Sequence, residues 1–432
     1  MTQLISVGVG QCGVQMASSF TDFYMSESSK YVDPDACGRF FFETRDKKHV
    51  ARCVLIDTER KAVTDTLQSR TGSTDWKYDR QSIWAQGCGS GNNWAYGYER
   101  NGFSAQGEVM DRLQHQAEKC DRFGGFVMFQ SLAGGTGSGL GSRITECTRD
   151  EFGHQAHIIN NVVWPYEAGE VLVQSYNSVL SLSCLSKNSD AVIITYNDVL
   201  HEICSDVKSG AENVTFADMN TIISQNLTGL LLPSSDICTI PLLSQPLGHL
   251  VPLPSRRLLS IFSLPIVSDA AQGFSVFNWD TLISNCLSMV STGNFTGKNV
   301  STIRRVIDPR STLMKKCDSL WIVLRGNEIS EGKTRLKQNE LLKCNRFFAK
   351  DNDTPIMTST NTRQFNRQEK SVNILANSQC IIPYLERLLE KCHSMIESSA
   401  YLHQYMNAGV SAEWINEDRM FLEQVLAEYK KM

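Results

Sequence analysis

The sequence predicts an α/β protein whose N-terminal half contains a parallel sheet covered by helices on both faces. Three observations support this fold class. Strand-like apolar runs alternate with helical patterns over the first two hundred residues. Polar clusters follow these strands, as expected where ligands bind beyond the carboxyl ends of parallel strands. A glycine-rich segment at residues 134–141 lies directly between a strand-like run and a helical pattern.

The predicted elements divide the chain into four parts. Strands are expected at residues 4–9, 51–56, 126–131, 157–163 and 191–195, and helices at 14–24, 60–68, 108–119, 142–152 and 171–182. A long apolar helical pattern at 216–231 ends before Pro233, and the proline-rich residues after it mark a domain boundary. Later come short strands at 319–324 and 371–375, then helical patterns at 383–398 and 419–430. We expect an N-terminal domain (1–215), a core helix (216–232), an intermediate α+β domain (233–376) and a C-terminal helical region (377–432).

Length, charge and cysteine usage exclude several classes of protein. The chain has 432 residues, which is too long for one ordinary core, and its 41% hydrophobic and 20% charged content is typical of a globular protein. A net charge of −4 gives no reason to expect nucleic acid as a partner. No apolar run approaches the roughly 20 residues that cross a bilayer, so membrane insertion is not expected. Fourteen cysteines without a C-x-x-C pair favour reduced thiols in a cytosolic protein over zinc or disulfides.

The glycine-rich segment is the main candidate for binding chemistry. Backbone N–H groups at a helix start lack intrahelical partners, and the helix dipole there favours negative charge. Glycines let the chain approach a phosphate closely, while Thr136 and Ser138 add hydroxyl groups. No lysine follows the segment, so it is not the G-x-x-x-x-G-K-[ST] loop. We therefore expect a phosphate held by backbone and hydroxyl groups rather than by a point charge.

Other polar clusters follow the neighbouring strands and complete one predicted site. They are Gln11-Cys12, Asp57-Thr58-Glu59, the loop at residues 89–94, Glu170 and Asn197-Asp198. Asp57 and Glu59 could orient Mg²⁺ through water, since magnesium takes few carboxylates and keeps several waters; solvated acids in a turn are the alternative. Asn197 and Asn220 could read a guanine edge, and Phe216 could stack on a base.

Two alternative readings concern the first loop. Cys12 could be a nucleophile, but no histidine is patterned to activate it, so a small residue packing beneath a ligand is favoured. Residues 8–13 also fit G-x-G-x-x-G, which would suggest a nicotinamide or flavin oxidoreductase. That fingerprint requires an acid at the end of the next strand, about 20 residues on. Here the next strand ends only at Asp57, and the reading leaves residues 134–141 without a role.

The motifs together resemble a known family. Residues 10–15, 91–95 and 134–141 resemble tubulin, and the last of these is close to the family's signature loop. The resemblance runs from residue 4 to about 430 and includes residues 400–405. Within the family, residues 164–166, 169–171 and 173–178 are most similar to the delta branch, as is Ala133 where many tubulins carry another glycine.

The resemblance implies a tubulin-like fold and a nucleotide site. The fold would be a Rossmann-like parallel-sheet GTP-binding domain, a core helix, a smaller α+β domain and a C-terminal helical hairpin. The cofactors would be GTP or GDP with Mg²⁺, which Glu59 and Asp57 would approach. The nucleotide contacts would be Gln11, Cys12, Glu59, Asn92, Ser131, Ala133, Gly134, Gly135, Thr136, Gly137, Ser138, Gly139, Glu170, Gln174, Asn197, Phe216 and Asn220. Phe216 replaces the family's base-stacking tyrosine, and Gln174 replaces an acid near the ribose.

The resemblance also implies a cellular role and limits the expected enzymology. Tubulins cleave GTP at a polymer contact, where a loop of the next subunit supplies an acid that positions water. The equivalent residue here is Gln245, and no Asp or Glu lies between Asp236 and Asp269. A neutral amide cannot act as a general base, so we expect at most weak assembly-linked GTPase activity. The implied role is a structural subunit of the microtubule cytoskeleton in the cytoplasm, at centrioles, basal bodies and cilia, forming or stabilising compound microtubules with alpha, beta or another specialised tubulin. A freestanding nucleotide hydrolase remains the alternative.

Overall fold

The computed structural model describes residues 2–31, 34–69, 75–169, 171–208, 213–233, 243–267, 277–298, 303–308 and 311–432. They form two compact units: Met1–Asn197 with Pro383–Ala427, and Asp198–Ile382 with Glu428–Met432. The predicted α/β class is confirmed, while the four-part division of the chain stays a prediction. None of the helices within the described ranges combines the length and apolarity that a bilayer-spanning segment requires.

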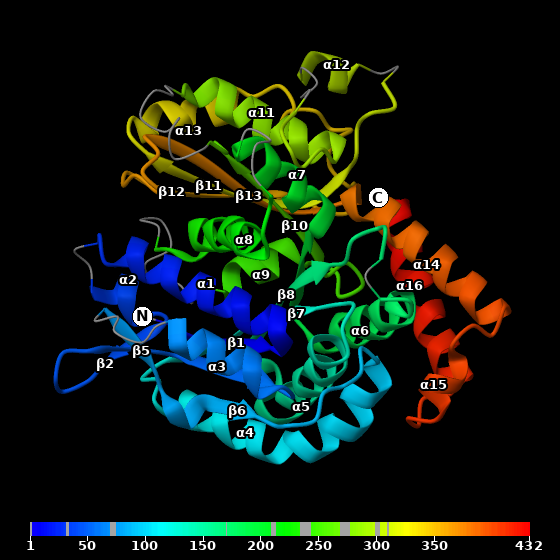
Figure 1. Ribbon diagram of the computed structural model, residues 1–432. Coiled ribbons are helices and arrows are strands. Elements are labelled where there is room, and N and C mark those ends of the chain that lie inside the picture. Colours follow the sequence, from blue (N-terminus) through cyan, green and yellow to red (C-terminus); the bar gives the residue numbers. More distant parts are fainter. Residues whose placement is uncertain are drawn as a thin grey trace. The chain divides into compact units, whose positions relative to one another are not determined.

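The first unit contains a parallel sheet of six neighbouring strands (Figure 1). In spatial order these are β6 (Ile83–Ala85), β4 (Cys53–Asp57), β1 (Gln3–Val9), β7 (Phe123–Ser131), β8 (His157–Trp164) and β9 (Ala191–Tyr196). Every pairing between them is parallel. All five residues of β4 are buried, as is typical of parallel strands covered on both faces.

Helices cover both faces of this sheet. On one face, α4 (Gly102–Glu118) and α5 (Gly141–Phe152) pack on an apolar cluster that includes Val7 and Met128. The opposite face of β1 is covered by α1 (Gly10–Ser28), because Gly8 faces Ala17 of that helix. Next to α1 lies α3 (Arg60–Ser69), and α6 (Gln174–Asn188) contacts α5 (Figure 1).

One predicted strand is divided in two. Residues 51–56 read as one apolar run, but β3 (His49–Ala51) belongs to a small second sheet and β4 to the main sheet. The chain passes between the sheets at Arg52, whose guanidinium donates to the Lys119 carbonyl at 2.9 Å. The small sheet also contains β2 (Phe41–Glu43), antiparallel to β3, and β5 (Trp76–Tyr78), parallel to it. A short helix, α2 (Pro34–Gly38), precedes β2.

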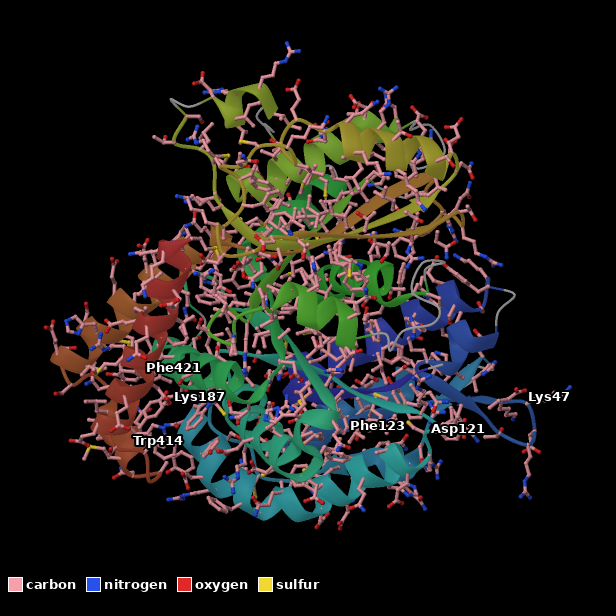
Figure 2. The ribbon with its side chains drawn as sticks, turned by 180° about the vertical axis from the view of Figure 1, so that it is seen from behind. Lys47, Asp121, Phe123, Lys187, Trp414 and Phe421 are labelled. Carbon is pink, nitrogen blue, oxygen red and sulfur yellow. The ribbon has the colours of Figure 1, made fainter. Side chains whose placement is uncertain are left out.

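The C-terminal helices α14 (Ile382–Glu397), α15 (Leu402–Met406) and α16 (Ala412–Lys431) contribute most of their length to the first unit. Lys187 of α6 lies 4.7 Å above the Phe421 ring and forms an ion pair with Asp418 at 2.6 Å. Figure 2 shows Lys187 of α6 with Phe421 and Trp414 of α16. The Trp414 ring meets Trp94 edge-on at 6.1 Å, which ties α16 to the loop that follows β6.

The second unit contains a mixed sheet with helices beside it. The strands in spatial order are β12 (Ile356–Asn361), β11 (Cys317–Gly326), β13 (Lys370–Ser378) and β10 (Leu258–Leu264). The pair β11–β12 is parallel, and β13 is antiparallel to both β11 and β10. The helices are α7 (Asn197–Val207, which starts at the last residue of the first unit), α8 (Phe216–Leu231), α9 (Ser244–Leu250), α11 (Trp279–Thr292), α12 (Ile303–Ile307) and α13 (Ile329–Gln338).

The predicted core helix has the bounds that the sequence indicates, residues 216–231. A capping box starts α8, because Thr215 accepts from the Asp218 N–H and Asp218 accepts from the Thr215 N–H. The buried Arg325 closes its other end by donating to the carbonyls of Gly229 (3.0 Å), Leu232 (2.6 Å) and Pro233 (2.9 Å). These carbonyls lack intrahelical donors, so a side chain from β11 satisfies the helix end.

Candidate functional site

The glycine-rich segment forms the start of a helix rather than a loop followed by one. Thr136–Leu140 winds as one π-helical turn and continues directly into α5 at Gly141. A second π-helical turn, Tyr96–Asn101, precedes α4. The sequence gives no local sign of either turn, although π-helical turns often occur at functional sites. The backbone N–H groups of residues 134–138 therefore stand at a helix N-terminus, where anions bind.

Two glycines bring the backbones of three loops into contact. Gly10 has φ +71°, and a Cβ added to it would lie 2.6 Å from the backbone nitrogen of Gly137. A Cβ on Gly135 would lie 2.7 Å from Cβ of Ser90 and 2.8 Å from the backbone nitrogen of Asn93. A side chain fits at neither position. The loops that follow β1, β6 and β7 thus meet backbone to backbone, as the sequence predicts for one edge of a parallel sheet.

A chain of hydroxyl groups joins the same loops. Thr136 Oγ1 lies within hydrogen-bond distance of Thr58 Oγ1 and 2.9 Å from Ser90 Oγ. Asn101 Nδ2 donates to Ser90 Oγ at 2.8 Å. Thr58 comes directly after β4, so the loops after β4, β6 and β7 are connected through Thr136. Sequence reasoning missed these roles of Thr58, Ser90 and Asn101, because partners 46 and 78 residues apart leave no local pattern.

Asn177 of α6 fixes the position of the 91–94 loop. Its Nδ2 donates to the carbonyls of Asn92 (2.9 Å) and Ala133 (2.6 Å), while its Oδ1 accepts from the Trp94 N–H at 2.9 Å. Tyr405 of α15 donates to the same Oδ1 at 2.5 Å. This fully buried amide has partners on both its oxygen and its nitrogen. It is a positioning residue that the sequence analysis did not identify.

The two predicted acids lie at the end of β4 in different environments. Asp57 is 2% exposed, and its Oδ1 accepts from the Glu59 N–H at 3.1 Å, while its Oδ2 has no partner among the residues that the structure describes. Burial, and to a smaller extent the Glu59 charge, raise the Asp57 pKa to about 6. Glu59 is exposed, and its carboxylate lies against Gly89. A cation beside Asp57 would offset the cost of burying this charge.

These residues fit a magnesium ion that is shared with phosphates. Mg²⁺ is bound in such sites by one or two carboxylates, several waters and substrate phosphate oxygens. The unpartnered Oδ2 of Asp57 and the exposed carboxylate of Glu59 supply that number of protein ligands. Within the described ranges there is no group of three or more His, Cys, Asp or Glu side chains that could hold a metal ion.

The first loop places Gln11 and Cys12 in the first turn of α1, immediately after β1. Cys12 Sγ lies 3.5 Å from Met16 Sδ, a packing contact one turn along the helix. After β7, Ser138 is 1% exposed and its hydroxyl has no partner in the described ranges, while the hydroxyl of Ser131 lies near Gly137. A buried hydroxyl at a helix N-terminus can donate its hydrogen bond to a bound anion.

Only some of the remaining predicted residues lie in the first unit with the loops described above. Gln174 begins α6, and its Nε2 donates to the Tyr166 carbonyl at 3.1 Å, while its buried Oε1 has no partner within the described part of the chain. Asn197 directly follows β9. Glu170 lies outside the described residues. Phe216 and Asn220 belong to the second unit, where they lie one turn apart on α8; the Phe216 ring is 55% exposed, whereas Asn220 is buried.

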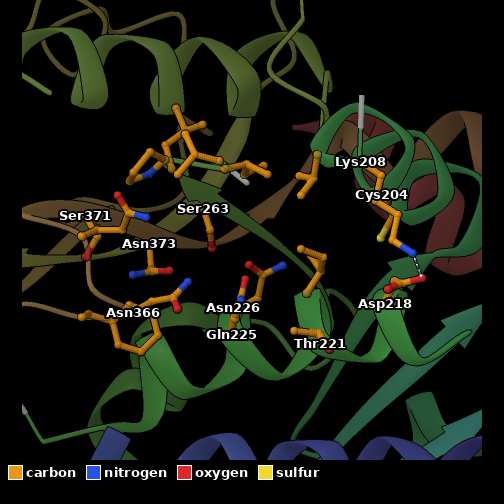
Figure 3. A pocket seen from close by; sticks show the side chains of 18 residues that line it. Cys204, Lys208, Asp218, Thr221, Gln225, Asn226, Ser263, Asn366, Ser371 and Asn373 are labelled. Atoms are coloured by element: carbon orange, nitrogen blue, oxygen red, sulfur yellow. Dashed lines mark ion pairs between the residues drawn. The ribbon is translucent and has the colours of Figure 1, made fainter. Parts of the chain in front are cut away.

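The second unit holds a separate cavity of about 440 Å³ that contains none of the predicted site residues (Figure 3). It lies between α7, α8, the end of β10 and the residues before and within β13. Its lining combines apolar residues with five amide side chains, Gln225, Asn226, Asn366, Gln368 and Asn373. Its charged pair is Lys208 with Asp218, joined at 2.9 Å.

Comparison with known proteins identifies the family. Residues 3–205 match the Tubulin/FtsZ family, GTPase domain. The chain is 31% identical to the tubulin delta chain of Macaca fascicularis over 455 residues, which cover 99% of each chain. It is also 31% identical to the tubulin delta chain of Homo sapiens, again over 99% of each chain. The tubulin epsilon chain of Mus musculus is 27% identical over 100% of this chain and 96% of its own.

The matched GTPase domain covers the strands and loops that build the site, from β1 to α7. The likeness to tubulin delta chains extends over 99% of the chain, beyond that domain. The family's GTPase domain implies that the chain binds GTP or GDP. This chain belongs to the tubulin family.

Proposed function

We propose that this chain is a delta-type tubulin. It is a GTP-binding structural subunit of the microtubule cytoskeleton that acts at centrioles, basal bodies and cilia, where it forms or stabilises compound microtubules. Its partners are other tubulins, either alpha and beta chains or another specialised isotype. The full-length likeness to tubulin delta chains supports this assignment.

One observation carries the nucleotide-binding part of the proposal. Three loops meet through bare backbone at Gly10, Gly135 and Gly137, beside a helix N-terminus with no lysine. Such a cradle fits a chain of phosphates, because each phosphate oxygen can accept from a backbone N–H group. Thr136 and the unpartnered hydroxyl of Ser138 add donors, and Gln11, Cys12 and Asn92 border the same loops. Phe216 would stack on the base and Asn197 and Asn220 would read its edge.

In this proposal Asp57 and Glu59 hold Mg²⁺ against the phosphates. When bound, the ion neutralises phosphate charge. The protein's own part is to keep the Asp57 carboxylate buried and oriented, through the hydrogen bond from the Glu59 N–H.

We further propose that the chain does not activate hydrolysis on a neighbouring subunit. Gln245 takes the place of the acid that positions water in tubulins, and it is exposed at the start of α9, where Pro246 follows it. An amide can orient water but cannot take its proton. The described part of the segment, residues 243–267, contains no Asp or Glu that could replace it.

A phosphate-release assay tests this point. The chain is added to a partner tubulin that carries GTP labelled on its terminal phosphate, and we expect no stimulated release. The variant Gln245→Glu restores a carboxylate at the same position and should increase release. Stimulation by the unmodified chain, equal to that by the variant, would overturn the proposal.

Ligand protection separates the proposed function from other nucleotide chemistries. A ligand that binds only the folded chain raises its unfolding temperature. GTP with Mg²⁺ should protect, whereas a nicotinamide dinucleotide should not. Protection by the dinucleotide alone would indicate an oxidoreductase, and GTP turnover by the dilute monomer would indicate a freestanding hydrolase.

A further inference from the structure

A cluster of three soft donor side chains lies in the first unit, on elements outside the proposed nucleotide site. Met25 comes from α1, Cys37 from α2 and His49 from β3. Cys37 Sγ is 3.7 Å from Met25 Sδ and 3.8 Å from His49 Nδ1. Met25 is 7% exposed, and Cys37 and His49 are half-buried. The proposed function uses none of these residues.

The spacing of the three donors fits a metal ion between them. Protein sulfur ligands lie about 2.3 Å and imidazole nitrogens about 2.0–2.1 Å from a zinc-sized ion. At the angles of a trigonal or tetrahedral site, two such ligands are separated by roughly 3.6–4.0 Å. The two separations around Cys37 Sγ fall in this range. We propose that Met25, Cys37 and His49 form a binding site for a soft monovalent metal ion, Cu(I).

The chemistry of the donors selects this ion. Thiolate and thioether ligands favour Cu(I), while a thioether is a poor ligand for harder cations. Charge gives a second argument. One thiolate with a monovalent ion makes a neutral unit, so no net charge is placed beside the buried Met25 side chain. Binding replaces the Cys37 thiol proton, which leaves to solvent, so no electron is transferred.

The surroundings of the cluster support its geometry. The Ser28 hydroxyl, which donates to the Met25 carbonyl at 3.3 Å, lies beside Cys37, where an outer group can orient a metal ligand. The His49 ring lies edge-on to Phe41 with ring centres 6.4 Å apart. The Tyr24 hydroxyl donates to the Ala36 carbonyl at 2.9 Å and so ties α2 to α1 beside the cluster. By contrast, Cys12 Sγ contacts a single further sulfur, Met16 Sδ, on its own helix, and Cys120 Sγ accepts from the cation Arg52.

Copper competition with matched variants tests the site. The full chain is titrated anaerobically with Cu(I) in the presence of a reductant and the chromophoric chelator bicinchoninate. We expect one Cu(I) per chain to be held against the chelator. Cys37→Ser should lose it, and Met25→Leu and His49→Gln should weaken binding at least tenfold. Cys344→Ser, which changes another half-buried thiol, should bind like the parent.

Two further measurements distinguish a metal site from loose binding to other thiols. Met25→Leu conserves volume, so its unfolding temperature without copper should match the parent's, and only the parent should be stabilised by Cu(I). X-ray absorption of the copper-loaded parent should show two sulfur neighbours and one nitrogen neighbour. Copper retained by Cys37→Ser, a sulfur-only shell, or displacement by an equal concentration of Zn²⁺ would each overturn the proposal.

Discussion

At the scale of single residues, the candidate site depends on glycines, because their lack of a side chain lets the loop backbones meet. Gly10 adopts φ +71° beside the backbone of Gly137, so Gly10→Ala combines backbone strain with a steric clash. We expect a loss of about 1–3 kcal/mol in the free energy of unfolding and at least a tenfold loss of GTP affinity. The matched control is Gly107→Ala on α4, where an added Cβ meets nothing within 4 Å.

The stability of the control should change in the opposite direction, because alanine has a higher helix propensity than glycine at an exposed position within a helix. We expect Gly107→Ala to stabilise the chain by up to about 1 kcal/mol and leave GTP affinity unchanged. Denaturant unfolding and nucleotide titration measure both effects. Equal GTP affinities for the two alanine variants would contradict the backbone cradle.

Asp57 gives a pH-dependent prediction at the same scale. Its folded pKa of about 6 lies above that of an exposed aspartate, so its contribution to stability is present below about pH 4 and is lost as the pH rises through about 6. Without nucleotide, Asp57→Asn should therefore be more stable than the parent at pH 8, by up to about 3 kcal/mol, and equal to it near pH 4. Denaturation of the nucleotide-free chain at both pH values measures this difference. An unchanged stability at pH 8 would argue against a buried, uncompensated carboxylate.

At the scale of elements, α8 shows how a remote side chain ends a helix. Arg325→Met would leave the buried carbonyls of Gly229 and Leu232 without their side-chain donor, and we expect a loss of about 2 kcal/mol or more in the free energy of unfolding. The Pro233 carbonyl keeps a donor, because Asn361 Nδ2 donates to it at 2.9 Å. Arg335→Met on α13 removes an exposed guanidinium whose one ion pair among the described residues is with Glu331 of its own helix, at 3.4 Å. That control should lose less than about 0.5 kcal/mol, as surface pairs do. Similar losses for both variants in denaturant melts would refute this role of Arg325.

The sequence predicted the elements that carry their signal locally. The strands β1, β7, β8 and β9 are apolar runs bounded by polar residues, and the core helix has its cap and its terminal proline in sequence. It did not predict that the run at residues 51–56 serves two sheets, because the division depends on pairing with other strands, β2 and β5 on one side of Arg52 and β1 on the other.

The sequence predicted that the loops of the candidate site meet at one edge of the sheet, but it did not predict the side-chain contacts that hold these loops in place. Residues 134–138 and Asp57 lie where the strand order places them, since parallel strands bring their carboxyl ends to one edge. Asn177 could not be recognised, because a single asparagine within an apolar helical pattern gives no sign of partners 44 and 85 residues away. The same holds for the hydroxyl chain through Thr136.

At the scale of the whole molecule, one family accounts for the chain over 99% of its length. The parallel sheet positions the loops, the glycines bring their backbones together, and α6 with the C-terminal helices fixes the loop at residues 91–94. The nucleotide binding that we propose depends on all of these contacts.

Identifying the small molecule that the chain carries tests this most directly. The freshly purified chain is denatured, and the released compound is identified and quantified by mass spectrometry. A guanine nucleotide in a near-equimolar amount is the expected result. A folded chain that releases no nucleotide, and whose unfolding temperature does not respond to added GTP with Mg²⁺, would contradict the account.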